Sequence, residues 1–560
     1  MKLRTPRGFQ DIMLDEAELR ESTCRRIGDF FAQASYRLIE TPVAERMDVL
    51  AAGFSHEKSP LIDDAFRFVD VDGTLLVLRS DVTLPLARVV ATRFDNVAGP
   101  YRLRYCTDVF REQEALRGQS RMLTQLGVEF LGAEGLEADL EIIQLALGGL
   151  GACGLEDYTL NLNNVSIFLA CIEAAEKYAQ DGASFKENVL SAAHRGDFVT
   201  VRALCDEVAL PAELEECITS LPFIRGKRDA LDAASRLVNA AGVAQAIEGV
   251  KQLTALYNSC ELQGLSGPLT LDMSLMPDLT YYTGLVFEIY APTSPLSLGS
   301  GGRYDQMAAL MGRSMPGAGF AYNVGRLVAA LRAREESPRR IDEVNRLKIA
   351  IPKGSLYKGS LKLLEKCGFD IEPLRDPKRQ LRILTDELDV IIAKPTDVAI
   401  YVANGAVQCG IGGKDILLEA DYPLLEMVDL KFGACKFVVA QPSEDTTSLV
   451  ERALAQGYVR VATKYPRITG QFFEAQGIQA EIVKLNGNIE LAPLIGIADV
   501  IVDITATGTT LRENNLVVVT DVMDISARFV ANPAAMRNNP EVSALAEKLY
   551  ALTKVGTSCN

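Results

Sequence analysis

The stretch from Val500 to Leu511, VIVDITATGTTL, most constrains what this chain can fold into. An apolar strand runs into Asp503, then into a Thr/Gly loop and the start of a helix. Gly508 lets the backbone approach an anion closely, and the loop offers hydroxyls beside the unpaired N–H groups that begin a helix. The stretch therefore predicts a phosphate site, with Asp503 facing ribose hydroxyls or a metal ion. The bare pattern also fits an ordinary turn with a helix N-cap.

The C-terminal half alternates strands and helices. Strands are expected at 347–351, 388–393 and 407–411, and a second set at 459–463, 480–485 and 500–504. Glycine stands where three of the intervening helices would end, as is usual at helix C-termini. The alternation indicates two α/β lobes, the second at about 440–520.

The N-terminal half has a different pattern, with long helical segments and alternating strands such as 122–131 and 282–290. This is typical of an antiparallel sheet in an α+β domain. Between about 167 and 258, apolar residues at helical spacing predict a helical insertion. A charged stretch at 332–346 is interpreted as a linker. The expected organisation is therefore a domain at 1–331, the linker, and a domain at 347–560.

Composition excludes several classes of protein. A chain of 560 residues should hold more than one core, and its net charge of −16 argues against a general nucleic-acid binder. Its 11 cysteines contain no C-x-x-C pair, which disfavours a zinc cluster, and two histidines leave little room for histidine-based catalysis. The N-terminus has no apolar leader, and no apolar run reaches the roughly 18 residues of a membrane span. We expect a cytoplasmic protein with no membrane partner.

Five segments of the C-terminal half occur in the order LKIAIPKGSL, DLKFGAC, VATKYP, NGNIELAPLIGIAD and VIVDITATGTTL. Together they resemble the short form of ATP phosphoribosyltransferase, which opens histidine biosynthesis. The resemblance implies a two-lobed α/β fold like that of periplasmic binding proteins, with ATP and phosphoribosyl pyrophosphate as substrates and Mg²⁺ as cofactor. Only about fifty residues follow Thr510, too few for a separate C-terminal regulatory domain.

The same resemblance implies the residues of the transferase site. Lys353, Lys394 and Asp503 would be catalytic, and Asp503 is also the candidate ligand of Mg²⁺. The residues implied to bind phosphoribosyl pyrophosphate or ATP are Gly354, Arg379, Lys464, Glu490, Thr505, Ala506, Thr507, Gly508, Thr509 and Thr510. Taken singly, each lysine could be a solvated surface charge, and Glu490 could only cap a helix or face solvent.

The chain departs from the family's pattern at three places. Ser355 follows Lys-Gly where the family has arginine, Lys394 replaces an arginine, and Val407 and Gln408 stand where an Ala-Asp pair is usual. Lysine keeps the charge but loses the forked grip of arginine on phosphate. Arg379 and Arg382 are expected to supply part of the lost contact.

Two strand-like segments flank a polar loop between 101 and 132, and Gln125 and Glu129 would share one strand face. A polar strand face is either solvated or lines a pocket for a charged small molecule. The loop, with Arg111, resembles the second signature motif of class II aminoacyl-tRNA synthetases. Residues 38–48 and 317–331 look like the first and third motifs.

Segments at 78–88, 281–290 and 299–307 are similar to the histidine-recognition segments of histidyl-tRNA synthetase. The resemblance implies a regulatory histidine site made of Asp81, Thr83, Arg111, Gln125, Glu129, Tyr281, Tyr282, Arg303 and Tyr304. At 277–280 the chain reads PDLT where the synthetase has Arg-Gly-Leu-Asp, so an arginine needed for adenylate formation is missing. No anticodon-binding domain follows the third motif.

The combined resemblance is to a fusion of the histidyl-tRNA synthetase-like regulatory subunit with the short-form catalytic subunit of ATP phosphoribosyltransferase. It implies that the first half binds L-histidine and inhibits the second, and that the chain forms a homo-oligomer, a tetramer or octamer. One alternative is a non-catalytic amino-acid or nucleotide sensor that keeps both folds. Another is a true aminoacyl-tRNA synthetase, which the missing arginine and the acidic charge disfavour.

Overall fold

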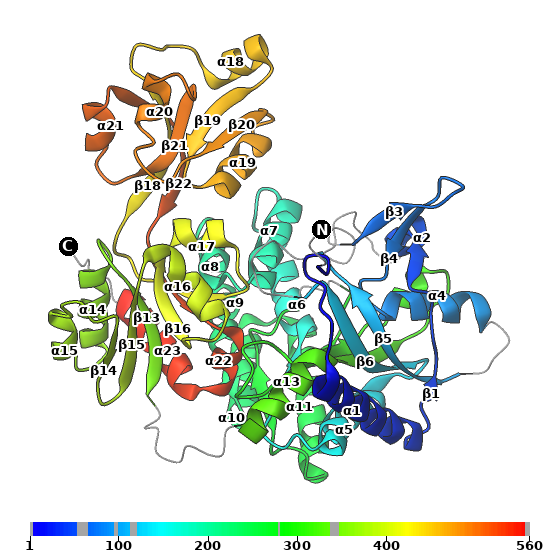
Figure 1. Cartoon of the computed structure of the whole chain (residues 1–560). Helices are drawn as coiled ribbons and strands as arrows, with labels where there is room; N and C mark the ends of the chain where they lie inside the picture. Colours follow the sequence, from blue (N-terminus) through cyan, green and yellow to red (C-terminus); the bar gives the residue numbers. More distant parts are fainter. Residues whose placement is uncertain are drawn as a thin grey trace. The chain divides into compact units, whose positions relative to one another are not determined.

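The computed structural model describes residues 4–52, 65–94, 99–112, 120–277, 281–336 and 346–554 (Figure 1). The chain divides into two compact units, Met1–Ile341 and Asp342–Asn560, each of which is described by itself. Most of the predicted linker, 337–345, lies outside the described residues, as do positions 278–280.

A nine-stranded sheet forms the centre of the first unit, in the order β1-β5-β6-β12-β11-β10-β7-β9-β8. Its strands are β1 (Arg37–Leu38), β5 (Tyr101–Phe110), β6 (Met122–Leu131), β7 (Thr159–Asn164), β8 (Arg225–Gly226), β9 (Leu269–Asp272), β10 (Leu285–Tyr290), β11 (Gly299–Arg303) and β12 (Gly317–Asn323). Among the strand pairs that the structure describes in this sheet, β1–β5 and β7–β9 are parallel and the others are antiparallel. The predicted α+β class, with an antiparallel sheet and helices, is confirmed.

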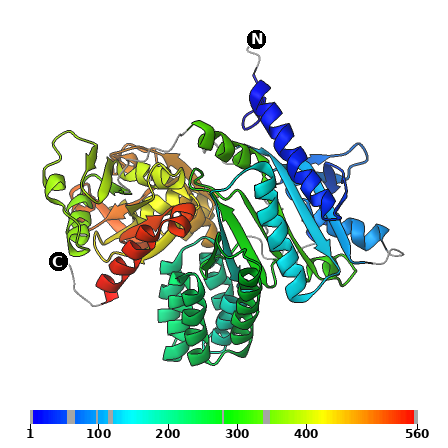
Figure 2. The ribbon, with the colours of Figure 1, turned by 90° about the horizontal axis from the view of Figure 1, so that it is seen from below.

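Three long helices cover one face of this sheet: α1 (Leu14–Gln33), α5 (Gly135–Cys153) and α13 (Val324–Glu336) (Figure 2). Ile27 and Phe31 of α1 and Ile142 and Leu150 of α5 are completely buried, so these helices supply much of the core. A small sheet, β2 (Ala44–Arg46), β4 (Leu75–Leu78) and β3 (Arg67–Val69), carries the chain towards α4 (Thr83–Arg93). The shorter helices α2 and α12 are Met47–Ala52 and Met307–Leu310.

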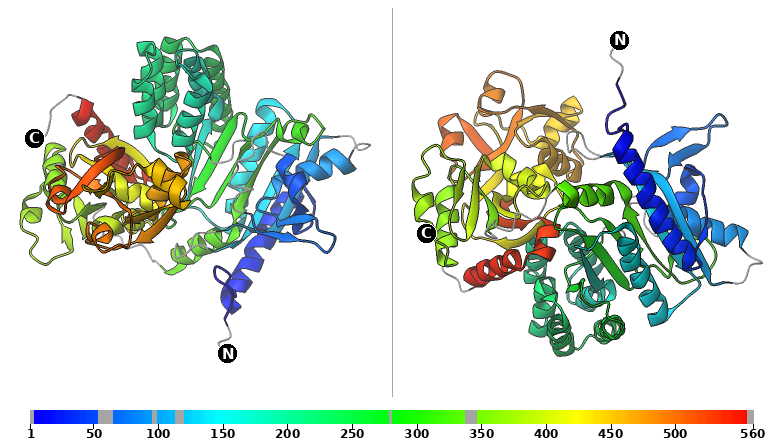
Figure 3. Two further views of the ribbon diagram at one scale, coloured as in Figure 1. Left: turned by 90° about the horizontal axis from the view of Figure 1, so that it is seen from above. Right: turned by 60° about the horizontal axis from the view of Figure 1, so that its bottom comes forward.

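The helical insertion forms a compact group of helices within this unit (Figure 3). It comprises α6 (Val165–Glu176), α7 (Gly182–His194), α8 (Phe198–Asp206), α9 (Ala212–Ser220), α10 (Arg228–Ala241) and α11 (Ala244–Leu262). Asp181 and Asp197 cap the first turns of α7 and α8 through their carboxylates. The insertion extends a few residues beyond the expected range at both ends.

The linker was expected to begin at 332, but α13 continues to Glu336. Arg332 forms an ion pair with Glu16 of α1 at 3.1 Å, and Arg334 donates to the carbonyl oxygen of Gly154 at 2.6 Å. These contacts anchor a polar helical extension that has no apolar stripe of its own. The helix thus extends five residues, 332–336, into the stretch expected as the linker.

The second unit contains two sheets, one in each lobe. The first-lobe sheet has the order β14-β15-β13-β16-β23-β17 and the second-lobe sheet the order β20-β19-β21-β18-β22. First-lobe strands are β13 (Leu347–Pro352), β14 (Arg382–Leu384), β15 (Leu388–Ala393), β16 (Cys409–Gly413), β17 (Leu425–Asp429) and β23 (Ala527–Ala531). Second-lobe strands are β18 (Cys435–Pro442), β19 (Val459–Thr463), β20 (Ala480–Lys484), β21 (Val500–Thr505) and β22 (Leu516–Ile525).

Helices connect these strands as the α/β pattern predicts. In the first lobe they are α14 (Tyr357–Lys366), α15 (Glu372–Arg375), α16 (Pro395–Ala403), α17 (Lys414–Ala420), α22 (Pro533–Asn538) and α23 (Pro540–Lys554). In the second they are α18 (Leu449–Gln456), α19 (Pro466–Ala475), α20 (Leu491–Leu494) and α21 (Thr509–Glu513). The chain crosses between the lobes twice, from β17 to β18 and from β22 back to β23 (Figure 1).

Side chains also join the two lobes. The Tyr465 hydroxyl, at the start of α19, donates to the Asp415 carboxylate of α17 at 2.9 Å. Glu419 of α17 accepts hydrogen bonds from the backbone N–H groups of Arg467 and Ile468. The two helices are thus held together by buried and partly buried polar contacts.

Candidate functional site

A cavity of about 350 Å³ opens among β5, β6, β10, β11 and β12 in the first unit. Eight of the nine residues implied for the histidine site line it: Asp81, Thr83, Arg111, Gln125, Glu129, Tyr281, Tyr282 and Tyr304. They come from the start of α4, the end of β5, the polar face of β6 and the segments next to β10 and β11. Residues far apart in the sequence therefore meet in one pocket, which we call the sensor pocket.

Glu129 lies at the base of the sensor pocket with 1% of its surface exposed. Its carboxylate accepts hydrogen bonds from the hydroxyls of Thr83 at 2.9 Å and Tyr105 at 3.3 Å, and another from Tyr304. Burial raises the pKa of Glu129 to about 8, although the hydroxyls of Tyr304 and Thr83 act in the opposite direction. Burial also raises the pKa of Asp81, which is 6% exposed.

Two features of the sensor pocket favour a bound ligand. The side-chain oxygen of Gln125 is buried and has no hydrogen-bond partner among the described residues, so it is placed to accept from a ligand N–H. Gly319 provides room, because a Cβ atom at this position would lie 1.9 Å from the Glu129 carboxylate. Tyr105 and Gly319 had not been identified from the sequence, where neither stands out from its strand.

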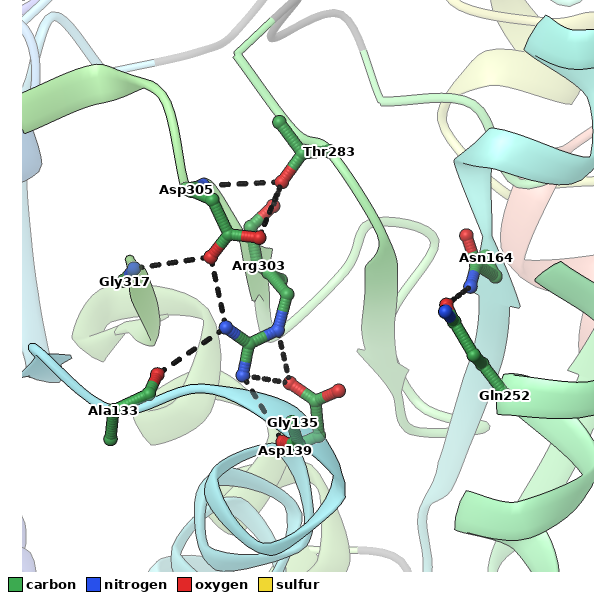
Figure 4. A network of polar contacts seen from close by, with 9 residues as sticks. All are labelled: Ala133, Gly135, Asp139, Asn164, Gln252, Thr283, Arg303, Asp305 and Gly317. Carbon is green, nitrogen blue, oxygen red and sulfur yellow. Dashed lines mark hydrogen bonds and ion pairs between the residues drawn. The ribbon is translucent and has the colours of Figure 1, made fainter. Parts of the chain in front are cut away.

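Arg303 does not reach the sensor pocket, so its expected role as a histidine ligand is wrong. Neighbouring residues of an extended segment point to opposite sides, and Tyr304 takes the side facing Glu129. The Arg303 guanidinium instead pairs with Asp139 at 2.7 Å and Asp305 at 2.9 Å (Figure 4). These residues line a separate cavity of about 540 Å³, on whose wall Asn164 donates to Gln252 at 3.2 Å.

In the second lobe, Asp503 lies near the end of β21, and the Thr/Gly loop follows directly after this strand. Gly508 has φ of +69°, and its N–H donates to the Thr505 hydroxyl at 2.9 Å. Thr507, Thr509 and Thr510 are exposed at the loop surface with Ala506. The helix that follows, α21, has only five residues. The loop's own N–H groups and hydroxyls are therefore the polar groups that this segment could offer to an anion.

Asp503 lies close to two other residues implied by the sequence. The Lys464 ammonium is 3.8 Å from its carboxylate. Burial raises the pKa of Asp503, Lys464 lowers it, and the nearby Glu490 carboxylate raises it further. The structure thus brings Lys464, Glu490 and Asp503 together beside the loop.

In the first lobe, a cavity of about 550 Å³ lies beside the carboxyl ends of β13 and β15. Its lining includes four cationic side chains and no carboxylate: Lys353, Lys358, Lys378 and Arg379. Gly354, with φ of +91°, turns the chain at its edge. We call this the cationic cavity. Lys394 follows β15, which pairs with β13 next to Lys353, so both lysines stand at the same edge of the sheet.

Comparisons with known proteins cover both halves. A family model described as histidyl-tRNA synthetase matches residues 8–327. The ATP phosphoribosyltransferase regulatory subunit of Acetivibrio thermocellus is 32% identical over 343 residues, which are 60% of this chain and 79% of the relative. The crystal structure of a histidine–tRNA ligase subunit from Alicyclobacillus acidocaldarius has a TM-score of 0.51 and 27% identity, covering 60% of this chain and 99% of that one.

For the second half, a family model described as ATP phosphoribosyltransferase matches residues 394–551. The ATP phosphoribosyltransferase of Alkaliphilus metalliredigens is 46% identical over 209 residues, which are 37% of this chain and 97% of the relative. The chain belongs to the ATP phosphoribosyltransferase family. It joins a regulatory-subunit-like first half, of the histidyl-tRNA synthetase fold, to a short-form ATP phosphoribosyltransferase, as the sequence predicted.

Three cations beside the expected site residues had not been identified from the sequence. Lys358 and Lys378 line the cationic cavity, and the Arg512 guanidinium donates to the Thr509 hydroxyl at 3.2 Å beside the Thr/Gly loop. Each is an exposed charge in an ordinary local pattern. Only the fold gathers them beside the expected residues.

Two kinds of feature are absent from the described residues of this chain. No group of three or more histidine, cysteine or acidic side chains there could hold a metal ion. No described helix is long and apolar enough to cross a membrane.

Proposed function

We propose that this chain catalyses the first step of histidine biosynthesis under the control of its own N-terminal half. Attack of the adenine N1 of ATP on the anomeric carbon of phosphoribosyl pyrophosphate would form N1-(5-phosphoribosyl)-ATP. The bond from that carbon to pyrophosphate breaks, and pyrophosphate leaves. The observation that carries this proposal is that one unit holds both the Thr/Gly loop beside Asp503 and the cationic cavity.

In the second lobe, the loop from Thr505 to Thr510 takes the 5′-phosphate through its N–H groups and hydroxyls. Asp503 holds the ribose hydroxyls, and its ionised form stabilises positive charge that develops at the anomeric carbon. Lys464 binds phosphate oxygens next to it. Glu490 faces the same ribose, which its place near Asp503 supports.

In the first lobe, Lys353, Lys394 and Arg379 bind the polyphosphate groups of the substrates. The cationic cavity has four positive side chains without a lining carboxylate, so a polyanion is the ligand that balances its charge. Holding two anionic substrates together is the main demand of this reaction, because the transfer needs no covalent enzyme intermediate.

The family uses a divalent metal ion, and we propose Mg²⁺ for this chain. Mg²⁺ is usually held by one or two carboxylates together with substrate phosphates rather than by a complete protein cage. Asp503, with Glu490 nearby, fits that arrangement. When bound, the ion would neutralise charge on the leaving pyrophosphate.

The sensor pocket is proposed to bind L-histidine as a feedback inhibitor. Asp81, Glu129 and Gln125 suit its ammonium and imidazole N–H groups, and Arg111 suits its carboxylate. We further propose 1–331 and 347–560 as the regulatory and catalytic domains, and a homo-oligomer, a tetramer or octamer, as the assembly.

The decisive experiment measures phosphoribosyl-ATP formation by the purified chain. ATP, phosphoribosyl pyrophosphate and Mg²⁺ are supplied with pyrophosphatase, and adenine absorbance is followed with and without L-histidine. We expect turnover that histidine suppresses. Turnover indifferent to histidine would contradict the sensor assignment. No turnover at all would favour a binding protein that has lost its chemistry.

The pKa of Glu129 predicts how histidine binding depends on pH. The folded-state pKa of about 8 lies above the ordinary carboxyl value. The free energy of unfolding of the protein without histidine should therefore fall as the pH rises through this folded-state pKa. An ammonium group in the pocket favours the ionised carboxylate, so binding should release a proton. We expect histidine to raise the melting temperature more at pH 8 than at pH 6. Calorimetry in two buffers of different ionisation enthalpy would measure the number of protons released on binding. Proton uptake would contradict the assignment of Glu129 as a histidine ligand.

A further prediction concerns Lys358. Replacing it with glutamine should raise the KM for the polyphosphate substrates by roughly tenfold, because one of the cavity's four charges is lost. Lys362→Gln, one turn further along α14 and outside the cavity lining, is the matched control. Equal KM values for the two variants would contradict the assignment of Lys358 to the substrate site. The same assay tests Arg379→Ala.

A further inference from the structure

Arg303 lies behind the sensor pocket rather than in it, and it joins several elements there (Figure 4). Only 8% of its surface is exposed. Its guanidinium donates to the Asp139 carboxylate from Nε at 2.8 Å, to Asp305 at 2.9 Å, and at 3.4 Å to the carbonyl oxygens of Ala133 and Gly135. The start of α5 is thereby fixed to the end of β11.

Thr283 extends this network to the segment that carries Tyr281 and Tyr282. Its N–H donates to the Arg303 carbonyl oxygen at 2.8 Å. Its hydroxyl donates to the Asp305 carboxylate at 3.3 Å and accepts from the Asp305 N–H at 3.1 Å. Asp305 also accepts from the Gly317 N–H at 3.3 Å. We call Asp139, Thr283, Arg303 and Asp305 the anchor cluster.

The anchor cluster and the sensor pocket share two short backbone segments. Tyr282 lines the pocket and precedes Thr283, while Tyr304 lines the pocket between Arg303 and Asp305. The tyrosine rings pack together, with centroids 4.7 Å apart for Tyr281 and Tyr282 and 5.9 Å for Tyr281 and Tyr304. A shift of either segment would move these rings relative to Glu129.

We propose that the anchor cluster is a positioning device for the effector site, which holds the three tyrosines of the sensor pocket in the geometry that binds histidine. It touches no ligand itself. This inference rests on the proposed histidine-sensing function. It assigns to Arg303 a role in regulation through backbone placement, in place of direct contact with the effector.

The test is histidine binding to the full chain by calorimetry, together with histidine inhibition of turnover. Thr283→Val keeps the shape of the side chain but removes the hydroxyl, and Asp139→Asn weakens the grip on Arg303. Each should raise the histidine dissociation constant by about fivefold to tenfold, the effect of one or two lost hydrogen bonds. Turnover without histidine should stay at the wild-type level, because both residues belong to the regulatory unit.

Two variants separate positioning from general stability. Thr283→Ser restores the hydroxyl and should bind histidine within about twofold of the wild type. Glu141→Gln breaks a similar arginine pair on the same helix, Arg102–Glu141 at 2.7 Å, whose residues do not line the sensor pocket. It should lower the melting temperature without changing the dissociation constant.

The outcomes are distinct. Wild-type affinity in both Thr283→Val and Asp139→Asn would overturn the proposal, and so would equal weakening in all four variants. If either Thr283→Val or Asp139→Asn fails to fold, the dissociation constant of the other variant still tests the proposal. A wild-type chain that does not bind histidine would instead overturn the sensor assignment itself.

Discussion

Asp503→Asn is expected to lower turnover at saturating substrates by at least about 100-fold, in the range seen when one preorganised electrostatic group is removed from an active site. Asparagine keeps the size of the side chain but loses the charge that we propose stabilises the anomeric carbon. The carboxylate is 9% exposed and accepts the Ile504 N–H at 2.9 Å, so its position is fixed before substrate binds. Initial rates and the KM for phosphoribosyl pyrophosphate would measure the loss.

The matched control is Asp499→Asn, at the residue immediately before the same strand. Asp499 forms an ion pair with Arg460 at 2.8 Å, and the length of β21 separates it from the Thr/Gly loop. It should change stability more than rate. Because burial raises the pKa of Asp503, the wild-type rate should fall as the pH drops through that raised value. A rate for Asp503→Asn within about threefold of the wild type would exclude the assigned role.

Glu129→Gln is expected to raise the histidine concentration needed for half-inhibition by about 30-fold or more, as when one partner of a buried charged hydrogen bond is removed. Three hydroxyls donate to this carboxylate, and an amide group cannot accept all three in the same way. Each inhibition curve should be normalised to the rate of the same variant without histidine.

Glu45→Gln serves as the control for this variant. Glu45 is 7% exposed and pairs with Arg88 at 2.6 Å in the same unit, but it does not line the sensor pocket. Its replacement removes a buried carboxylate without touching the effector site. If both variants weaken inhibition equally, the effect of Glu129 is one of stability, and histidine binds elsewhere.

Much of the fold follows from local pattern. The ranges expected for β6, β15 and β19 coincide with the observed strands, because each is an apolar or alternating run between turn residues. The second lobe starts at 435 and ends at 525, slightly outside the expected range. The two segments that cross between the lobes are short and join strand directly to strand, β17 to β18 and β22 to β23. The amino-acid composition therefore does not change where the chain passes from one lobe to the other.

The errors and omissions share one cause: they depend on contacts between distant segments. Arg303 and Tyr304 are adjacent in the sequence, and only the register of β11 with β12 shows which of them faces Glu129. The helical continuation beyond 331 depends on partners such as Glu16, far away in the chain. Lys358, Lys378 and Arg512 carry no local signal, since an exposed cation looks the same whether or not it faces a site.

β23 is the last strand in the chain, yet it lies between β16 and β17 in the first-lobe sheet. During synthesis, every strand of the second lobe emerges from the ribosome before β23 does, since β22 ends at Ile525. Domains generally fold as units while the chain is being made. The second lobe can therefore fold while the first still exposes unpaired strand edges on β16 and β17, which are templates for aggregation. In the nascent protein, these edges stay without their final partner until residues 527–531 have been made.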